Sequence, residues 1–383
     1  MLQCFSLLKT PFPLEAIIMM QTPTWNEFVG FMKHVQFVAK SPYLVARILN
    51  GFRQSLVMQK PVLRSIELAI TYRCQAACDF CYSDTLLNRG RKELSIKEIR
   101  KLWDECLKLG AIHVNITGGE PMIRKDWDEA IAACNPERTI VSMVSNGELL
   151  TKKNVRRAKN AGLRYLQISL DSANPEIHNE SRKVKDLFQK AVRGMEYAKE
   201  EGITVSLSTV VTNENAPKRD VWEIIDLAEK HDVFLLLNLA AMAGRWQNNR
   251  HCILTPKTME YVREFRQHPT VRQNTMYNFR MKAGCPAGTE KFYVTSYGDV
   301  TPCPLTHISY GNIRESSVRQ IWTRMLGTNP YNLHSTKCLR CENTDYYKKY
   351  IDPLADLMAQ GIQMPVPIEQ HPAWEQRHLP IQV

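Results

Sequence analysis

The sequence predicts an α/β fold in which six strand–helix units form an incomplete (β/α)6 barrel, followed by a smaller domain. Between residues 66 and 241, apolar β-rich runs alternate with helical patterns, which is typical of a parallel sheet. Beyond residue 241 this alternation gives way to a stretch punctuated by Gly and Pro. The six predicted strands cover residues 66–70, 112–116, 140–144, 165–170, 205–211 and 233–239.

The segments between these runs have the spacing of amphipathic helices. Apolar residues recur at helical intervals over residues 95–109, 185–199 and 218–230. Ser95 is followed three residues later by Glu98, which predicts a capping box at a helix start. In a parallel barrel the loops after the strands converge on one face, so we expect functional residues there.

Composition places four parts along the chain and excludes several classes of protein. The parts are an amphipathic helical segment (1–63), the barrel (64–245), a small cysteine-containing domain (246–350) and a Pro-rich extended arm (351–383). The formal net charge is +11, but Lys and Arg are spread along the chain, which argues against DNA binding. No apolar stretch approaches the ~20 residues of a membrane-spanning helix, so we expect a cytoplasmic protein.

Eleven cysteines are present, and seven of them fall into two groups typical of metal ligands rather than disulfides. The first group, Cys74, Cys78 and Cys81, has the spacing CxxxCxxC in a loop directly after the first strand, with Phe80 before the last cysteine. A four-iron cluster normally takes four protein ligands, so three cysteines leave one iron open. A structural zinc site is the alternative, although no fourth Cys or His follows within ten residues.

At these residues the chain resembles the radical S-adenosylmethionine (SAM) superfamily, and the resemblance extends to later strand ends. It implies a partial (β/α)6 TIM-like barrel that binds a [4Fe-4S] cluster through the three cysteines. In such enzymes the GGEP segment, here residues 117–121, holds the amino group of SAM. Residues at the later strand ends match, less strictly, family positions that lie near the ribose and the carboxylate of SAM. The residues expected to contact SAM are Phe80, Gly118, Gly119, Glu120, Ser145, Asn146, Ser169, Asp171 and Arg182.

The second group of cysteines is Cys285, Cys303, Cys338 and Cys341, and four thiolates suit either an iron–sulfur cluster or zinc. Twelve residues, Gly298 and four more residues separate the first two, which resembles the SPASM/Twitch auxiliary domain of radical SAM enzymes. Full SPASM domains carry further cysteines, so the shorter Twitch variety, with one fully ligated [4Fe-4S] cluster for electron transfer, is the expectation. The cysteines expected to be incidental are Cys4, Cys106, Cys134 and Cys252.

The front segment contains two predicted short amphipathic helices within residues 25–56. Ser41 followed by Pro42 marks the start of the second one. The apolar side of these two helices is expected to pack on the barrel. Two alternatives remain open, namely docking of residues 25–60 to an acidic carrier and peripheral contact with anionic lipid. The cations of the lipid hypothesis are Lys33, Lys40, Arg47 and Arg53.

These features predict a radical SAM oxidoreductase or maturase of a biosynthetic pathway, with reduced flavodoxin or ferredoxin as electron donor. Such an enzyme cleaves SAM reductively to a 5′-deoxyadenosyl radical, which abstracts hydrogen from a small molecule, lipid or peptide. The fold does not choose among these substrates, and no catalytic acid or base stands out. The alternatives are an RNA-modifying radical SAM enzyme and a zinc-stabilised, non-enzymatic binding protein on a degenerate barrel.

Overall fold

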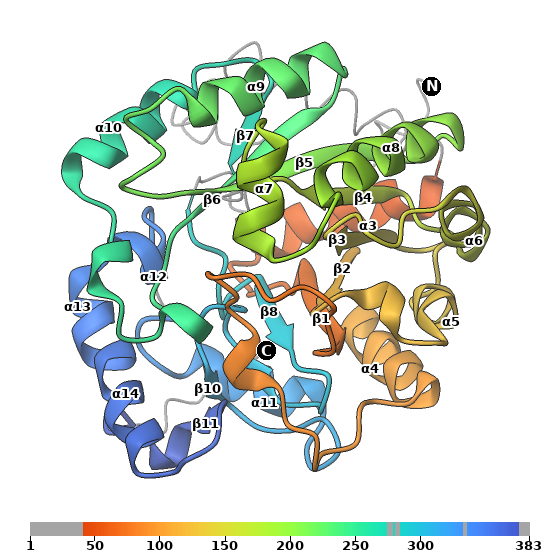
Figure 1. Cartoon of the computed structure of the whole chain (residues 1–383). Coiled ribbons are helices and arrows are strands. Elements are labelled where there is room, and N and C mark those ends of the chain that lie inside the picture. The colour runs from red at the N-terminus through yellow and green to blue at the C-terminus, as the bar shows by residue number, and fades with distance from the viewer. Residues whose placement is uncertain (1–40, 274–278, 280–283, 332–334, 375–383) are drawn as a thin grey trace.

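The computed structural model describes residues 41–273, 279, 284–331 and 335–374. Within them, nine strands form one sheet in the order β7-β6-β5-β4-β3-β2-β1-β8-β9 (Figure 1). Strands β1 to β6 pair in parallel with their neighbours in sequence, which confirms the six predicted strands and the partial barrel. Their bounds are β1 Ser65–Thr71, β2 His113–Gly118, β3 Ile140–Ser145, β4 Tyr165–Ser169, β5 Thr204–Val211 and β6 Phe234–Leu239.

Helices follow these strands and cover the outside of the sheet (Figure 1). The capping box at Ser95 is confirmed, because its hydroxyl accepts from the Glu98 amide while the Glu98 carboxylate accepts from the Ser95 amide. The helices of the barrel are α4 Ile96–Lys108, α5 Trp127–Ala133, α6 Lys152–Ala161, α7 Pro175–Arg182, α8 Leu187–Glu200, α9 Asp220–Lys230 and α10 Pro256–Phe265.

The two faces of the parallel sheet differ in chemistry. The face that packs on the helices is apolar and buried, as Leu68, Ile116 and Ile168 illustrate. The opposite face, here called the inner face, is partly accessible and carries many polar side chains. The strand register places these on one side of the sheet. They include Glu67, Asn115, Ser142, Gln167, Ser206 and Asn238.

The sheet continues past the six predicted strands at both edges. Strand β7 (Val271–Gln273) pairs with β6, and β8 (Lys291–Val294) pairs in parallel with β1. A hairpin then joins β8 to β9 (Val300–Thr301), and its turn contains Gly298, whose φ of +93° suits glycine. The cysteine-containing domain is therefore built directly onto the β1 edge of the barrel.

The prediction of an extended arm over residues 351–383 is wrong for residues 351–374, the part of it that the structure describes. Helix α14 (Asp352–Ala359) follows residue 351, and β11 (Val366–Pro367) pairs with β10 (Ile308–Ser309). Pro353 is tolerated because it lies in the first turn of α14, and Pro367 because it lies in a strand of only two residues. Val366, which precedes Pro367, is fully buried in the core. The other helices here are α11 Val318–Leu326, α12 Leu339–Glu342 and α13 Thr344–Tyr346.

The described part of the front segment packs on the barrel. Helix α3 (Pro42–Phe52) starts at Ser41 as predicted, and its Leu44 is buried in a small apolar cluster with Phe279. Arg47 does not face outward, since its guanidinium donates to the carbonyls of Leu107 and Ala111. For Arg47, the alternative in which this side chain faces anionic lipid is therefore wrong. Lys33, Lys40 and the first predicted helix lie outside the described residues.

No helix in the described residues is both long and apolar enough to cross a membrane. Three of the cysteines that were expected to be incidental, Cys106, Cys134 and Cys252, are buried, and burial raises the pKa of Cys134 to about 12. They act as small apolar core residues. Cys4 lies outside the described residues.

Candidate active site and auxiliary metal centre

The loop that carries Cys74, Cys78 and Cys81 leaves the carboxyl end of β1, where a parallel barrel places its chemistry. Its backbone is tied to the end of α7, because the Ala77 amide donates to the Arg182 carbonyl at 3.2 Å. A similar bond runs from the Asp79 amide to the Ser181 carbonyl. The loop therefore has a fixed path between β1 and α7.

The three thiols of this loop influence one another electrostatically. The pKa of Cys74 is raised to about 11, mainly by burial and further by Glu120, Cys78 and Cys81. Burial also raises the pKa of Cys78, which the nearby Arg182 opposes. Within the described residues, no three Cys, His, Asp or Glu converge as ligands of a single ion would. A four-iron cluster spreads its ligands over several metal atoms, so it suits such a set.

Gly118 and Gly119 pack against the backbone that leads into the cysteine loop. A Cβ atom on Gly118, where φ is +144°, would lie 2.0 Å from the Thr71 carbonyl oxygen. At Gly119 it would lie 2.4 Å from the Arg73 carbonyl oxygen. The Gly119 and Glu120 amides donate to the same two carbonyls at 2.8 and 2.9 Å. Only glycine allows this approach, so the segment fixes the residues immediately before Cys74.

Glu120 is fully buried and joins the ends of β2 and β3. Its carboxylate accepts hydrogen bonds from the Ser145 hydroxyl at 3.1 and 3.2 Å and from the Asn146 amide at 2.8 Å. The Met122 amide donates a further bond. Burial nevertheless raises the pKa of Glu120 to about 7, because these hydrogen bonds offset the loss of water only in part.

Asn146 connects the end of β3 to the cysteine loop. Its side-chain nitrogen lies 3.8 Å from the Cys74 sulfur. Its side-chain oxygen accepts from the Gln75 side chain at 3.2 Å and from the Glu148 amide at 3.0 Å. Asn146 is thereby held with a donor directed at the first predicted cluster ligand.

Asp171 and Arg182 form a buried ion pair beside the cysteine loop. Asp171 follows β4, and the Arg182 guanidinium meets its carboxylate at 2.6 and 2.8 Å. The same guanidinium lies 4.0 Å from the Cys78 sulfur and over the Phe80 ring at 5.4 Å. Four of the predicted residues therefore come together here. Ser169 ends β4 on the inner face, two residues before Asp171.

The loop after β6 also contacts the cysteine loop, and the sequence reasoning missed it. Gly244 has φ of +58°, and a Cβ there would lie 2.0 Å from the Cys81 carbonyl oxygen. The Arg245 amide donates to that same oxygen at 2.9 Å. The Arg245 guanidinium donates to the carbonyls of residues 77 and 78 at 2.6 and 3.1 Å. Residues 244–246 therefore clamp the outer side of the loop.

A signal for this clamp existed in the sequence. The rule that functional residues follow parallel strands applies to the end of β6 as well as to the first four strands. Trp246 completes the contact, with its ring 5.8 Å from that of Phe80. Residues 244–246 contain no cysteine or carboxylate that would mark them as functional in the sequence.

The four cysteines of the second group lie near one another between the barrel and the small domain, although not as the ligands of a single ion would. Cys285, Cys303 and Cys341 all influence the pKa of Cys338, and Cys285 influences that of Cys303. Cys338 caps the short helix α12, and Cys341 lies 3.8 Å from the Leu239 carbonyl at the end of β6. Four soft sulfur donors in one place fit an iron–sulfur cluster.

Buried donors without partners accompany this group of cysteines. Arg340, between Cys338 and Cys341, is 2% exposed, and one of its terminal nitrogens has no partner. Two buried nitrogens of Arg266 also lack partners, and this guanidinium is close enough to Cys338 for their charges to interact. Native proteins rarely leave such donors unsatisfied, so they fit an anionic group among the cysteines.

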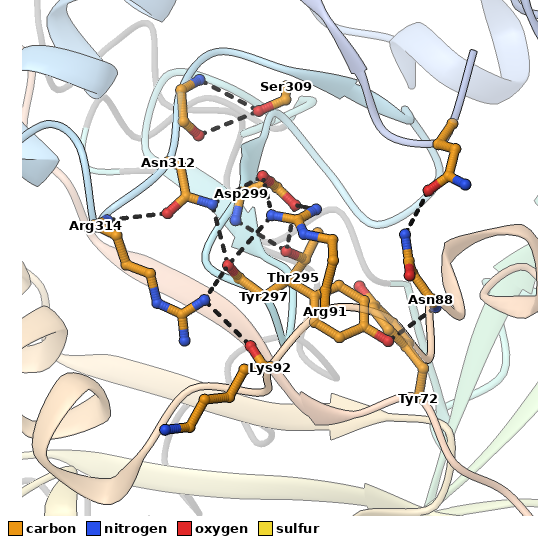
Figure 2. A network of polar contacts seen from close by, with 12 residues as sticks. Tyr72, Asn88, Arg91, Lys92, Thr295, Tyr297, Asp299, Ser309, Asn312 and Arg314 are labelled. Carbon is orange, nitrogen blue, oxygen red and sulfur yellow. Dashed lines mark hydrogen bonds and ion pairs between the residues drawn. The ribbon is translucent and has the colours of Figure 1, made fainter.

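The small domain is held to the barrel by the polar network of Figure 2, which surrounds Asp299. Arg91, in the segment between the cysteine loop and α4, meets the Asp299 carboxylate at 2.6 and 2.9 Å. Asn312 and Thr295 donate to the same carboxylate at 2.9 and 3.1 Å. Arg314 donates to the Lys92 carbonyl at 3.1 Å. The turn after β8 is therefore fixed to the barrel by several bonds at once.

The fold and the two cysteine sites define a class of protein, namely partial-barrel iron–sulfur enzymes with an auxiliary cluster domain. Residues 68–228 match the model of the radical SAM superfamily, and residues 285–342 match that of the SPASM iron–sulfur cluster-binding domain. The chain belongs to the radical SAM superfamily and is an enzyme that binds SAM and [4Fe-4S] clusters. This confirms the resemblance seen in the sequence.

Curated relatives share about a quarter of their residues with this chain. The AdoMet-dependent heme synthase of Oleidesulfovibrio alaskensis is 27% identical over 74% of this chain and 81% of the relative. The PqqA peptide cyclase of Rhizobium meliloti is 25% identical over 68% and 74%. The Fe-coproporphyrin III synthase of Methanosarcina barkeri is 27% identical over 72% and 80%.

Solved structures show the same fold at lower identity. Streptococcus suis SuiB bound to the precursor peptide SuiA superposes with a TM-score of 0.55 at 17% identity, covering 71% of this chain and 66% of SuiB. The anSMEcpe enzyme with bound AdoMet and a Cp18Cys peptide gives 0.53 at 16% identity, covering 78% of this chain and all of that one (100%). At these identities the likeness concerns the fold alone.

Proposed function

We propose that this protein is a radical SAM oxidoreductase or maturase that abstracts hydrogen from a biosynthetic substrate and uses its auxiliary cluster for electron transfer. Cys74, Cys78 and Cys81 would hold a [4Fe-4S] cluster with one open iron, which in its reduced state would supply the electron for cleavage of SAM to methionine and a 5′-deoxyadenosyl radical. The observation that carries the proposal is the convergence of three strand-end segments and α7 on the loop of Cys74, Cys78 and Cys81.

The residues around this loop are proposed to hold SAM and to keep its reactive carbon in place. Gly118 and Gly119 set the path into the loop, and Glu120 provides a buried carboxylate for the ammonium group of SAM. Asn146 is positioned beside Cys74, where it can orient the amino acid part of SAM. Arg182, neutralised in part by Asp171, offers a donor to the SAM carboxylate.

Cys285, Cys303, Cys338 and Cys341 are proposed to ligate the auxiliary cluster. With four protein ligands the cluster has no open iron, so its role is electron transfer rather than substrate binding. The pKa of Cys285 is raised by Cys338 and by burial, and that of Cys303 by burial, whereas the backbone at Leu339, Ala287 and Leu305 acts in the opposite direction. The backbone therefore favours the thiolate forms, which are the forms that bind metal.

The inner face of the barrel favours a substrate with hydrogen-bonding groups over an apolar lipid. Glu67, Asn115 and Gln167 lie at the centre of this face and are partly accessible. Glu67 pairs with Lys291, and the Asn115 oxygen accepts from Ser142. An apolar chain would offer no hydrogen bond to the Asn115 amide nitrogen or to the Gln167 amide, at about 1–3 kcal/mol for each buried group. The relatives named above act on tetrapyrroles or peptides, so we propose a polar small molecule or a peptide as the substrate class.

The experiment that tests this function removes the three ligands of the first cluster. The Cys74→Ala/Cys78→Ala/Cys81→Ala variant, reconstituted without oxygen, should contain roughly half of the ~8 irons of the parent. It should form no 5′-deoxyadenosine from SAM with dithionite as reductant. The control Cys252→Ser, at a cysteine outside both groups, should keep the iron content of the parent and should still form 5′-deoxyadenosine. Formation of 5′-deoxyadenosine by the triple variant would refute the proposal, and zinc in place of iron in the parent would favour a binding protein.

A further inference from the structure

Two cationic side chains with unsatisfied donors belong to this region: Arg340 lies between Cys338 and Cys341 in the chain, and Arg266 is close enough to Cys338 for their charges to interact. Arg340 is almost fully buried, and its guanidinium donates to the Leu305 carbonyl at 2.8 Å and to the Met242 carbonyl. It also stacks over the Tyr347 ring at 4.8 Å. These partners are neutral, and one terminal nitrogen has none.

Arg266, at the end of α10, approaches the same cysteines from another element. Two of its guanidinium nitrogens are buried without a partner. Burial lowers its pKa, while Glu342 and Cys338 act in the opposite direction. In the part of the chain that the structure describes, neither Arg266 nor Arg340 has a carboxylate within ion-pair distance.

Lys291 provides a useful contrast in the same region. It lies near Cys285 and Cys303, and its ammonium group meets the Glu67 carboxylate at 2.7 Å. That pair is nearly neutral as a unit. In the described residues Arg266 and Arg340 have no carboxylate in contact, and Glu342 acts on Arg266 only from beyond ion-pair distance. A buried cation without an anion in contact is costly in a protein interior.

An iron–sulfur cluster held by four thiolates carries a net negative charge in both of its redox states. It would supply the anion that the two guanidiniums lack. Positive charge and hydrogen bonds near the sulfurs stabilise the more negative, reduced state, which raises the reduction potential. We therefore propose that Arg266 and Arg340 set the potential of the auxiliary cluster and make it a better acceptor of one electron. This inference rests on the proposed assignment of the four cysteines to that cluster.

The two side chains are positioning residues, since they act through the cluster and not on the substrate. The test is a potentiometric titration of the full-length protein with both clusters, followed by electron paramagnetic resonance. The same titration on the triple variant at Cys74, Cys78 and Cys81 identifies the auxiliary signal. The variants are Arg266→Met, Arg340→Met and Arg340→Lys, with iron content measured on each sample. Arg263→Met is the control, because this arginine lies on the same helix as Arg266 with its side chain 62% exposed.

We expect both Arg→Met variants to shift the auxiliary potential to more negative values, while Arg340→Lys and Arg263→Met stay close to the parent. Loss of the cluster in Arg340→Met but not in Arg340→Lys would also support the inference, because it would show that the cluster needs a positive charge at this position. Unshifted potentials with full iron would overturn the inference, as would loss of the cluster in both Arg340 variants. If the triple-cysteine variant with both arginines intact shows no cluster at all, the assignment of the four cysteines fails instead.

Discussion

Replacing Gly244 with alanine tests whether the loop after β6 clamps the first cysteine loop. Gly244 has φ of +58°, and an added Cβ would lie 2.0 Å from the Cys81 oxygen and 2.5 Å from the Tyr82 carbonyl carbon. Both neighbours are backbone atoms, which cannot rotate away as a side chain can. The Gly244→Ala protein must therefore move either the clamp or the segment that carries Cys81.

The size of the effect follows from two separate costs. A left-handed backbone conformation costs an alanine about 1–2 kcal/mol. Forcing an extra carbon into a packed site typically costs a further ~1–3 kcal/mol. Gly361 provides a matched control, because its φ is +84° and no atom lies within 4 Å of an added Cβ. Gly361→Ala should therefore show only the first cost, and the difference between the two variants measures the contact with the cysteine loop.

The assay compares thermal stability, iron content and formation of 5′-deoxyadenosine for the two variants, prepared anaerobically. We expect Gly244→Ala to be less stable than Gly361→Ala and to lose iron from the first cluster or to cleave SAM more slowly. Gly361→Ala should keep its iron and its rate. If Gly244→Ala matches Gly361→Ala in all three measurements, residues 244–246 do not hold the cysteine loop.

Two further predictions concern Glu120 and the auxiliary cysteines. Since the pKa of Glu120 is raised to about 7, its anionic fraction, and with it SAM affinity, should rise roughly eightfold from pH 6 to pH 7.5. In calorimetry, Glu120→Gln should bind SAM more weakly than the parent and with less dependence on pH. If the two proteins show the same SAM affinity at each pH, Glu120 has a structural role only. The Cys338→Ser/Cys341→Ser variant should lose about four irons and still form uncoupled 5′-deoxyadenosine, whereas conversion of substrate stops. Substrate turnover at the parent rate in folded protein would make the auxiliary cluster structural.

The six parallel strands were predictable because each is a local pattern of apolar, β-branched residues followed by a helical repeat. Strand β7 was not, since it has three residues and no repeat that a window could detect, and neither was the parallel pairing of β8 with β1. The pairing of Ser65 with Lys291 joins residues more than two hundred positions apart. Contacts of that kind depend on the assembled sheet and leave no local trace in the sequence.

The candidate site was predictable where its chemistry coincides with strand ends. Functional residues are expected after the carboxyl ends of parallel strands, and there Glu120, after β2, accepts a hydrogen bond from the amide of Asn146, after β3. Gly244 and Arg340 were missed for a different reason. Glycine in a loop is common, and an arginine is expected in solvent, so only the close approach to Cys81 and the burial of the guanidinium distinguish them.

The arrangement of the two cysteine sites follows from the pairing of β1 with β8. β1 leads directly into the loop of the first cluster, and β8 lies between Cys285 and Cys303. The two strands are further joined by the Glu67–Lys291 ion pair and by the 2.7 Å bond between the Tyr72 and Tyr293 hydroxyls. Both contacts lie away from bulk water, so they resist separation of the strands. The electron transfer proposed above would depend on the distance between the two cysteine groups. That distance is set by neighbouring strands of one sheet rather than by a linker between two domains.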